Sequence, residues 1–196
     1  MMFVMRMFVA IEPSPDAVEH LDDFLAVRRE SGPEVRWTSP SRWHLTLAFM
    51  GAAPERVVED VVEGVGAVAD RSAPVALAVT GGGCFPDVTR AKVLFAGVGG
   101  VDGVPGAVAE LGRLAPGVRS ACAVAGAAPE GGAFVPHLTL GRFSWAHDAT
   151  RWLRVFSTYA GPGWVASDVT VVASHLPRER GHGPRHEVLA RLPLGG

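Results

Sequence analysis

Residues 44–47 read His-Leu-Thr-Leu, and residues 137–140 repeat the same four letters. A repeat of Ala, Val or Gly would mean little here, but the chain contains only seven histidines. Each copy lies in a short apolar and aromatic stretch that is typical of a strand, and one copy falls in each half of the chain. The repeat therefore predicts two related strands in two related parts of the fold.

Strand geometry gives the repeat a chemical meaning, because side chains alternate between the two faces of a strand. His44 and Thr46 share one face, while the leucines between them point to the other. His137 and Thr139 share a face in the same way. If the two strands face each other, two imidazoles and two hydroxyls meet in one cleft.

These four side chains suit attack at phosphorus. Imidazole titrates near pH 6.5, so one neutral ring can accept a proton while a protonated ring donates one. Threonine hydroxyls can donate to phosphate oxygens. We expect no metal, because two histidines with no Asp or Glu inside either tetrapeptide fall short of a metal-ligand set. The remaining alternatives are a metal site with further ligands and two amphipathic strands whose polar groups are merely solvated.

Composition sets the broad class. With 196 residues, 48% hydrophobic and 19% charged, residues 1–196 are expected to form a single domain with its own core. The net charge of −2 argues against a broad basic surface for long duplexes, but it allows a short or terminal nucleic-acid target. Cys84 and Cys122 are read as reduced thiols of a cytoplasmic, monomeric protein. No apolar run reaches the ~18 residues of a membrane-spanning helix, so no membrane association is expected.

The pattern along the chain indicates an α+β fold in two similar halves. The predicted helices are 16–29, 54–69, a helix from 102 or 105 to 114, and 148–159. The predicted strands are 4–11, 43–50, 74–80, 91–98, 119–124, 135–143, 164–174 and 186–192. The glycines at 81–83 are read as part of the turn between two of these strands.

The pair of tetrapeptides resembles the His-x-Thr-x doublet of the 2H phosphoesterase superfamily. Its surroundings resemble the RNA 2′,3′-cyclic phosphodiesterases of bacteria and archaea, historically called 2′-5′ RNA ligases. The segments that carry the resemblance are Arg6–Ile11, Trp43–Gly51, Gly83–Pro86, Pro136–Arg142 and Arg185–Leu189. The sequence departs from the family pattern at His186, where members often carry Tyr, and at Ser174-His175.

The resemblance implies two pseudo-symmetric lobes, each with a small, mainly antiparallel sheet and outer helices, and an active-site cleft between them. It also implies hydrolysis of a 2′,3′-cyclic phosphate on an RNA end or small cyclic nucleotide to a 2′-phosphate, without a cofactor. By analogy His44 is the acid and His137 the base, although identical motifs leave this order open. The alternatives are another 2H activity, on a 2′-5′ oligonucleotide or an ADP-ribose cyclic phosphate, and a non-catalytic RNA-end binding module.

Further residues are candidates for stabilising or binding the substrate. Thr46, Thr139 and Arg142 are expected to stabilise charge on the phosphate, but strand alternation turns Arg142 away unless the strand bulges or ends near Gly141. Phe49 and Trp43 are the aromatics expected to bind a base by stacking, with burial in the core as the alternative. Arginines in predicted loops that could contact phosphates are Arg36, Arg42, Arg178, Arg180 and Arg185.

Overall fold

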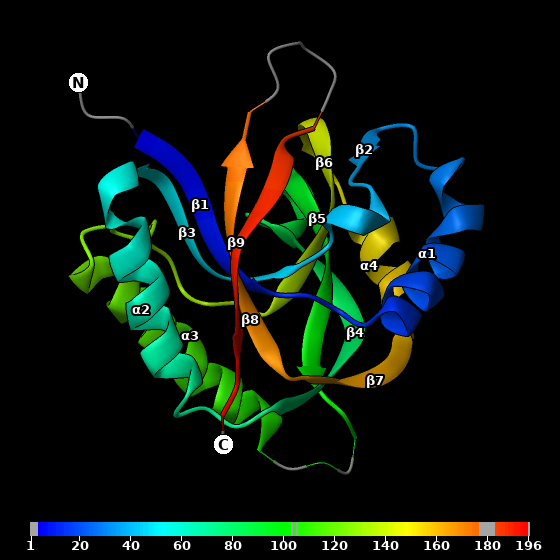
Figure 1. Cartoon of the computed structure of the whole chain (residues 1–196). Coiled ribbons are helices and arrows are strands. Elements are labelled where there is room, and N and C mark those ends of the chain that lie inside the picture. Colours follow the sequence, from blue (N-terminus) through cyan, green and yellow to red (C-terminus); the bar gives the residue numbers. More distant parts are fainter. Residues whose placement is uncertain (1–3, 103, 105, 177–182, 196) are drawn as a thin grey trace.

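The computed structural model describes residues 4–102, 104, 106–176 and 183–195. Its helices are α1 (Pro15–Arg29), α2 (Val58–Ala69), α3 (Ala107–Val124) and α4 (Thr150–Phe156). Its strands are β1 (Val4–Ile11), β2 (Val35–Trp37), β3 (Leu45–Pro54), β4 (Val75–Phe85), β5 (Ala91–Gly100), β6 (His137–His147), β7 (Ala160–Ala166), β8 (Asp168–His175) and β9 (Arg185–Pro193). Figure 1 shows a curled sheet with helices on its outside.

The strands form one antiparallel sheet in the order β7-β4-β5-β6-β3-β1-β8-β9, with β2 paired to β6. The first lobe consists of β3, β1, β8 and β9 with α2 and α3; the second consists of β7, β4, β5, β6 and β2 with α1 and α4. In Figure 1 the two pairs of helices flank the sheet on opposite sides. The expected α+β fold with two lobes is confirmed.

The sequence pattern indicated that each lobe is one half of the chain. The structure shows that the lobes do not coincide with the halves. The chain starts in the first lobe with β1, but α1 packs against β7 of the second lobe. It later returns to the first lobe with β8, which pairs with β1. Each lobe therefore draws strands from both ends of the sequence, and the two cannot be separated by one cut.

Helix α1 follows directly from its sequence. Ser14 caps its start by accepting a hydrogen bond from the backbone N–H of Ala17 at 3.2 Å, and a proline occupies the first turn, where no N–H is needed. Ala17, Leu21 and Leu25 recur at helical spacing and are buried. The predicted helix is confirmed.

The predicted strand 119–124 is wrong, because these residues form the C-terminal part of α3. The helix continues through Pro116 and Gly117. Leu111, Leu114, Val118 and Cys122 are buried along one helical face, and this tertiary burial outweighs the local preference. Residues 103 and 105, at the predicted start of this helix, lie outside the described part. No helix among the described residues is both long and apolar enough to cross a membrane.

The predicted strand 164–174 is also wrong, because it is two strands in different lobes, the edge strand β7 and the inner strand β8. Strand β7 pairs with β4 in the second lobe, and β8 pairs with β1 and β9 in the first. The chain crosses between them at Ser167, whose carbonyl accepts a hydrogen bond from Leu194 at 2.8 Å. The glycines at 81–83 likewise belong to β4 rather than to a turn, and Gly81 takes a positive φ of 62° where the pairing with β5 shifts.

Candidate active site

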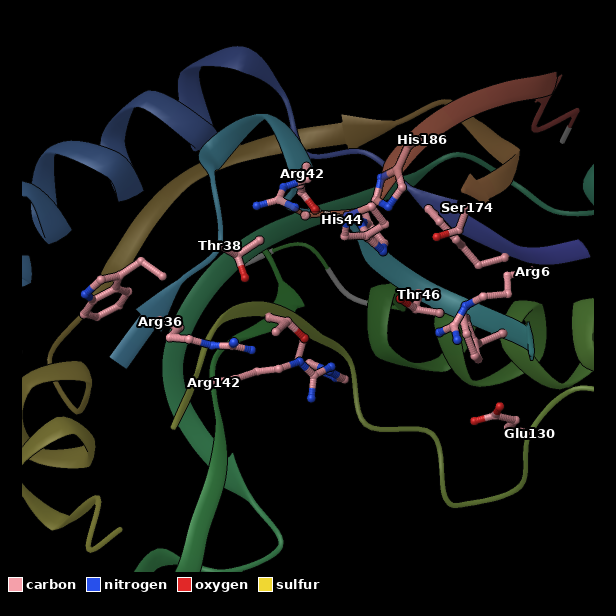
Figure 2. Close-up of a pocket in the computed structure, with 17 residues that line it drawn as sticks. Arg6, Arg36, Thr38, Arg42, His44, Thr46, Glu130, Arg142, Ser174 and His186 are labelled. Atoms are coloured by element: carbon pink, nitrogen blue, oxygen red, sulfur yellow. Dashed lines mark hydrogen bonds between the residues drawn. The ribbon is translucent and has the colours of Figure 1, made fainter. Parts of the chain in front are cut away.

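A pocket of about 830 Å³ opens where the two lobes meet. All four predicted catalytic residues, His44, Thr46, His137 and Thr139, line it. Figure 2 shows the pocket with side chains from both lobes directed into it. The structure therefore brings together the two copies of the repeat that the sequence placed 93 positions apart.

The contact between β3 and β6 positions the two copies. Leu45 and Leu138 are directly opposite each other in this antiparallel pair, and both are buried, with exposed fractions of 0% and 1%. Because the leucines point into the core, the histidines and threonines on either side of them point to the other face. The charge of His137 contributes to the lowered pKa of His44, so the two rings are within electrostatic reach.

Each imidazole is held by the same backbone contact. His44 Nδ1 lies 2.7 Å from the carbonyl oxygen of Arg42, and His137 Nδ1 lies 2.7 Å from that of Val135. A carbonyl can only accept, so in both rings Nδ1 carries the hydrogen and donates it. The Nε2 atoms are thereby left with a lone pair in the neutral ring, available for proton transfer.

Aromatic side chains fix the ring planes. Phe8 stacks on His44 with centroids 4.4 Å apart and planes at 14°, while His186 meets the same ring edge-on at 5.6 Å. His137 is packed by Phe85 and Phe95 at 5.2 and 5.0 Å. Rings held on two sides and at Nδ1 have little rotational freedom, which is what a positioned acid or base requires.

The surroundings of both rings favour their neutral form. Burial lowers the pKa of His44 to about 4, although the hydrogen bond to the Arg42 carbonyl works in the opposite direction. Burial also lowers the pKa of His137, and the positive charge of Arg142 lowers it further. A bound anion would act in the opposite sense on both, because a negative charge stabilises imidazolium.

A β-bulge after each threonine brings one more side chain to the pocket. In the pairing of β1 with β3, the partners of Val9 and Ala10 are Ala48 and Thr46, so Leu47 is an extra residue. In the pairing of β5 with β6, the partners of Leu94 and Phe95 are Gly141 and Thr139, so Leu140 is extra in the same way. The bulges are thus at equivalent positions of the two repeats.

The bulges answer the question of where Arg142 points. An extra residue reverses the alternation of faces, so the second residue after each bulge joins the face of the preceding His and Thr. Phe49 and Arg142 occupy equivalent positions after the two bulges, and both line the pocket. Arg142 therefore reaches the site because β6 bulges near Gly141. The bulged residue is Leu140, one position earlier.

Trp43 does not line the pocket. Its exposed fraction is 4%, and it belongs to the hydrophobic core, as expected for the immediate neighbour of His44 on an alternating segment. Among other aromatic residues, Trp37 lines the pocket and Phe85 packs on His137, whereas Phe134 is not among the lining residues.

Arg36 and Arg42, two of the arginines predicted to contact phosphates, line the pocket. Arg185 does not, and it pairs instead with Glu187 at 3.4 Å. Arg178 and Arg180 lie outside the described residues.

Several lining residues were missed from the sequence. Arg6 and Phe8 of β1 line the pocket. Further lining residues are Thr38, Glu130, Ser174 and His186. A signal existed for Arg6, since it is the one charge in an apolar strand and shares the face of Phe8 two positions later. Four arginines and one glutamate make the lining positive, although the chain as a whole carries −2.

The described residues contain no group of three or more His, Cys, Asp or Glu that could hold a metal ion. The pocket offers a ligand the imidazoles of His44 and His137, the hydroxyls of Thr46 and Thr139, and several guanidinium groups. This set can bind an anionic phosphate and move protons on either side of it.

Comparison with known proteins agrees with this chemistry. The family model described as LigT-like phosphoesterase matches residues 11–95. A Geobacillus stearothermophilus protein named RNA 2′,3′-cyclic phosphodiesterase is 28% identical over 189 residues, covering 96% of this chain and 57% of that protein. A protein of the same name from Aquifex aeolicus is 27% identical over 163 residues, 82% of each chain. This chain thus spans little more than half the length of the Geobacillus relative.

Solved structures share the fold. E. coli LigT complexed with 3′-AMP superimposes with a TM-score of 0.75 at 23% identity, covering 99% of this chain and 100% of LigT. A Thermus thermophilus protein gives a TM-score of 0.72 at 26% identity, covering 98% of this chain and 99% of that protein. The resemblance to this phosphoesterase family is confirmed.

Proposed function

From its relationship to the LigT-like phosphoesterases of the 2H superfamily, we propose that this chain hydrolyses the 2′,3′-cyclic phosphate of RNA ends or small nucleotides. The product is a 2′-phosphate with a free 3′ hydroxyl. One observation carries the proposal: two imidazoles line one pocket, each with its Nδ1–H donated to a carbonyl and its Nε2 left for chemistry.

The proposed reaction is an in-line displacement at phosphorus. One neutral Nε2 takes a proton from water as its oxygen bonds to phosphorus. The bond between phosphorus and the 3′ oxygen breaks, and that oxygen receives a proton from Nε2–H of the other ring. The family resemblance favours His44 as the acid and His137 as the base.

The charge of the substrate explains how one imidazole becomes protonated and can act as the acid. Both rings favour the neutral state in the free protein, with the pKa of His44 lowered to about 4. The phosphodiester anion raises the pKa of both imidazoles, so one of them takes up a proton in the complex. Thr46 and Thr139 then donate to the non-bridging oxygens, and the guanidinium of Arg142 offsets the developing charge.

We also propose that no metal or other cofactor takes part and that residues 1–196 act as a single bilobed unit. Acid, base and charge stabilisation are all supplied by side chains of the pocket. The interleaving of the lobes supports the single unit, because neither lobe consists of a continuous segment.

A turnover assay tests the proposal. A short RNA ending in a 2′,3′-cyclic phosphate is incubated with the protein in the presence of a chelator, and the product is identified by mass and by its phosphorus resonance. We expect a 2′-phosphate at an undiminished rate. Activity lost with the chelator would indicate a metal, and tight binding without product would indicate a binding module. Turnover confined to a 2′-5′ oligonucleotide or an ADP-ribose cyclic phosphate would indicate a sister activity.

A further inference from the structure

Two arginines of the pocket are direct neighbours on adjacent strands. Arg36 of β2 is the register partner of Arg142 of β6. Gly141 allows this approach, because a Cβ there would lie 2.5 Å from Val35 Cγ1 and 2.9 Å from the carbonyl oxygen of Arg36. In Figure 2 the two side chains extend side by side in the same direction, into the pocket.

This pair has no counter-charge within the described part of the protein. Among the described residues, no ion pair connects either guanidinium to a carboxylate, whereas Arg29, Arg90 and Arg191 each pair with an acidic side chain. Like charges directly opposite each other in a sheet are destabilising. The repulsion between the two guanidinium groups is reduced when an anion binds between them.

The arginine pair is displaced from the imidazole pair along β6. Strand β6 pairs with β3 at Leu138 and with β2 from Gly141 to Phe143. Leu138 and Arg142 are four residues apart, which corresponds to about 13 Å of strand at roughly 3.3 Å per residue, somewhat less across the bulge. Arg142 acts on His137 through its charge, and Arg36 adds a second guanidinium from the neighbouring strand.

The charges also exceed what one phosphate requires. A cyclic phosphodiester carries a single negative charge, while four arginines and one glutamate line the pocket. A substrate with a second phosphate matches the charge of this lining better than a nucleoside 2′,3′-cyclic phosphate does. Guanidinium groups also suit the task, because their fork of N–H donors binds phosphate oxygens in pairs.

We propose that Arg36 forms a second phosphate subsite beside Arg142, and that this subsite takes the phosphate on the 5′ side of the terminal nucleoside. The inference rests on the proposed function and narrows its substrate class to cyclic phosphates that carry this additional phosphate. Two sources share the chemistry: the internucleotide phosphate of an RNA chain and the 5′-phosphate of a free nucleotide.

Three substrates separate the possibilities: a nucleoside 2′,3′-cyclic phosphate, the same compound with a 5′-phosphate, and a dinucleotide ending in the cyclic phosphate. We expect kcat/KM to be at least about tenfold higher for the two substrates with the second phosphate. In Arg36→Gln this advantage should fall about tenfold, and in Arg36→Lys, which keeps the charge but loses the fork, it should fall less. A gain for the dinucleotide alone that depends on Arg36 would assign the subsite to RNA chains.

The matched control is Arg154→Gln, which removes an exposed arginine of α4 outside the pocket and should leave the advantage unchanged. Equal kcat/KM for all three substrates, or an advantage that persists in Arg36→Gln, would overturn the subsite. If none of the three is hydrolysed, the proposed function fails, and the subsite is then judged by calorimetry. Nucleoside 2′,5′-bisphosphate should bind more tightly than the 2′-phosphate to the wild-type protein, and this difference should shrink in Arg36→Gln. Equal affinities of the wild-type protein for the two compounds would refute the subsite.

Discussion

Leu45 and Leu138 face each other across the junction of the two lobes, and they occupy the same place in the two His-Leu-Thr-Leu repeats. Because β3 and β6 are antiparallel, this one register pair relates the two repeats by an approximate twofold axis. His44 and His137 therefore lie on opposite sides of this axis. An in-line displacement needs its acid and base in this relation, on either side of the phosphorus.

The junction should be sensitive to loss of volume. Leu45→Ala or Leu138→Ala removes a fully buried side chain, and each should lower the free energy of unfolding by about 2–5 kcal/mol. Urea denaturation followed by circular dichroism measures this change. Val27→Ala, at a helix position that is 77% exposed, is the control and should alter stability by less than about 0.5 kcal/mol. Equal effects at the two kinds of site would mean that the junction is loosely packed.

The paired role of the imidazoles predicts large losses of turnover with little structural change. His44→Ala and His137→Ala should each lower kcat by about 10² or more, as expected for removal of an acid or a base. His175→Ala, which removes a half-buried histidine hydrogen-bonded to Glu187 outside the pocket, should keep the wild-type rate. A near-normal rate in either pocket variant, with the circular dichroism spectrum unchanged, would refute the paired role.

The repeat made the central part of the site predictable. Alternation of faces is local to a strand, so His44 and Thr46 could be assigned to one face from the sequence alone. Their convergence with His137 and Thr139 followed from the assumption that the two repeats face each other. Trp43 was misjudged as a binding residue although the same alternation places it in the core.

What escaped prediction depends on tertiary structure. The bulges at Leu47 and Leu140 leave no clear mark in the sequence, yet they decide that Phe49 and Arg142 reach the pocket. The crossing at Ser167 depends on which lobe pairs with β7 and which with β8, so a continuous apolar pattern concealed it. Pro116 is tolerated inside α3 because of burial that only the packed fold provides.

The lowered pKa values predict an acidic optimum for kcat/KM, which reports on the free enzyme. Catalysis needs one protonated and one neutral imidazole. Both rings have a pKa below the usual 6.5 in the free enzyme, and that of His44 is lowered to about 4. kcat/KM should therefore peak below pH 6.5 and fall as the pH rises. kcat should peak at a higher pH, because the bound anion raises both pKa values. Initial rates between about pH 4 and 9 measure both profiles, and flat profiles across that range would exclude imidazole proton transfer as the limiting step.

Arg142 should influence both the rate and the titration of His137. Its positive charge contributes to the lowered pKa of His137, so Arg142→Gln should raise that pKa. The same variant should lower kcat by about 10², the cost of removing one group that stabilises developing charge. Proton NMR of the His137 ring, assigned with His137→Gln, follows the titration. A slower enzyme with an unchanged His137 titration would place the guanidinium away from this ring.

His186 should set part of the proton affinity of His44. Burial is the main cause of the lowered pKa of His44, and the charge of His186 lowers it further, while the Arg42 carbonyl and Glu12 act in the opposite direction. His186→Gln removes only the neighbouring imidazole, so the pKa of His44 should rise but stay below 6.5, because Phe8 and the buried setting remain. NMR titration of the His44 ring measures the shift, with His175→Gln as a control that leaves it in place. Because the acidic limb of kcat/KM follows the free enzyme, it should move to higher pH together with the ring titration. A His44 titration that stays in place, or moves to lower pH, would show that the two rings touch without electrostatic coupling.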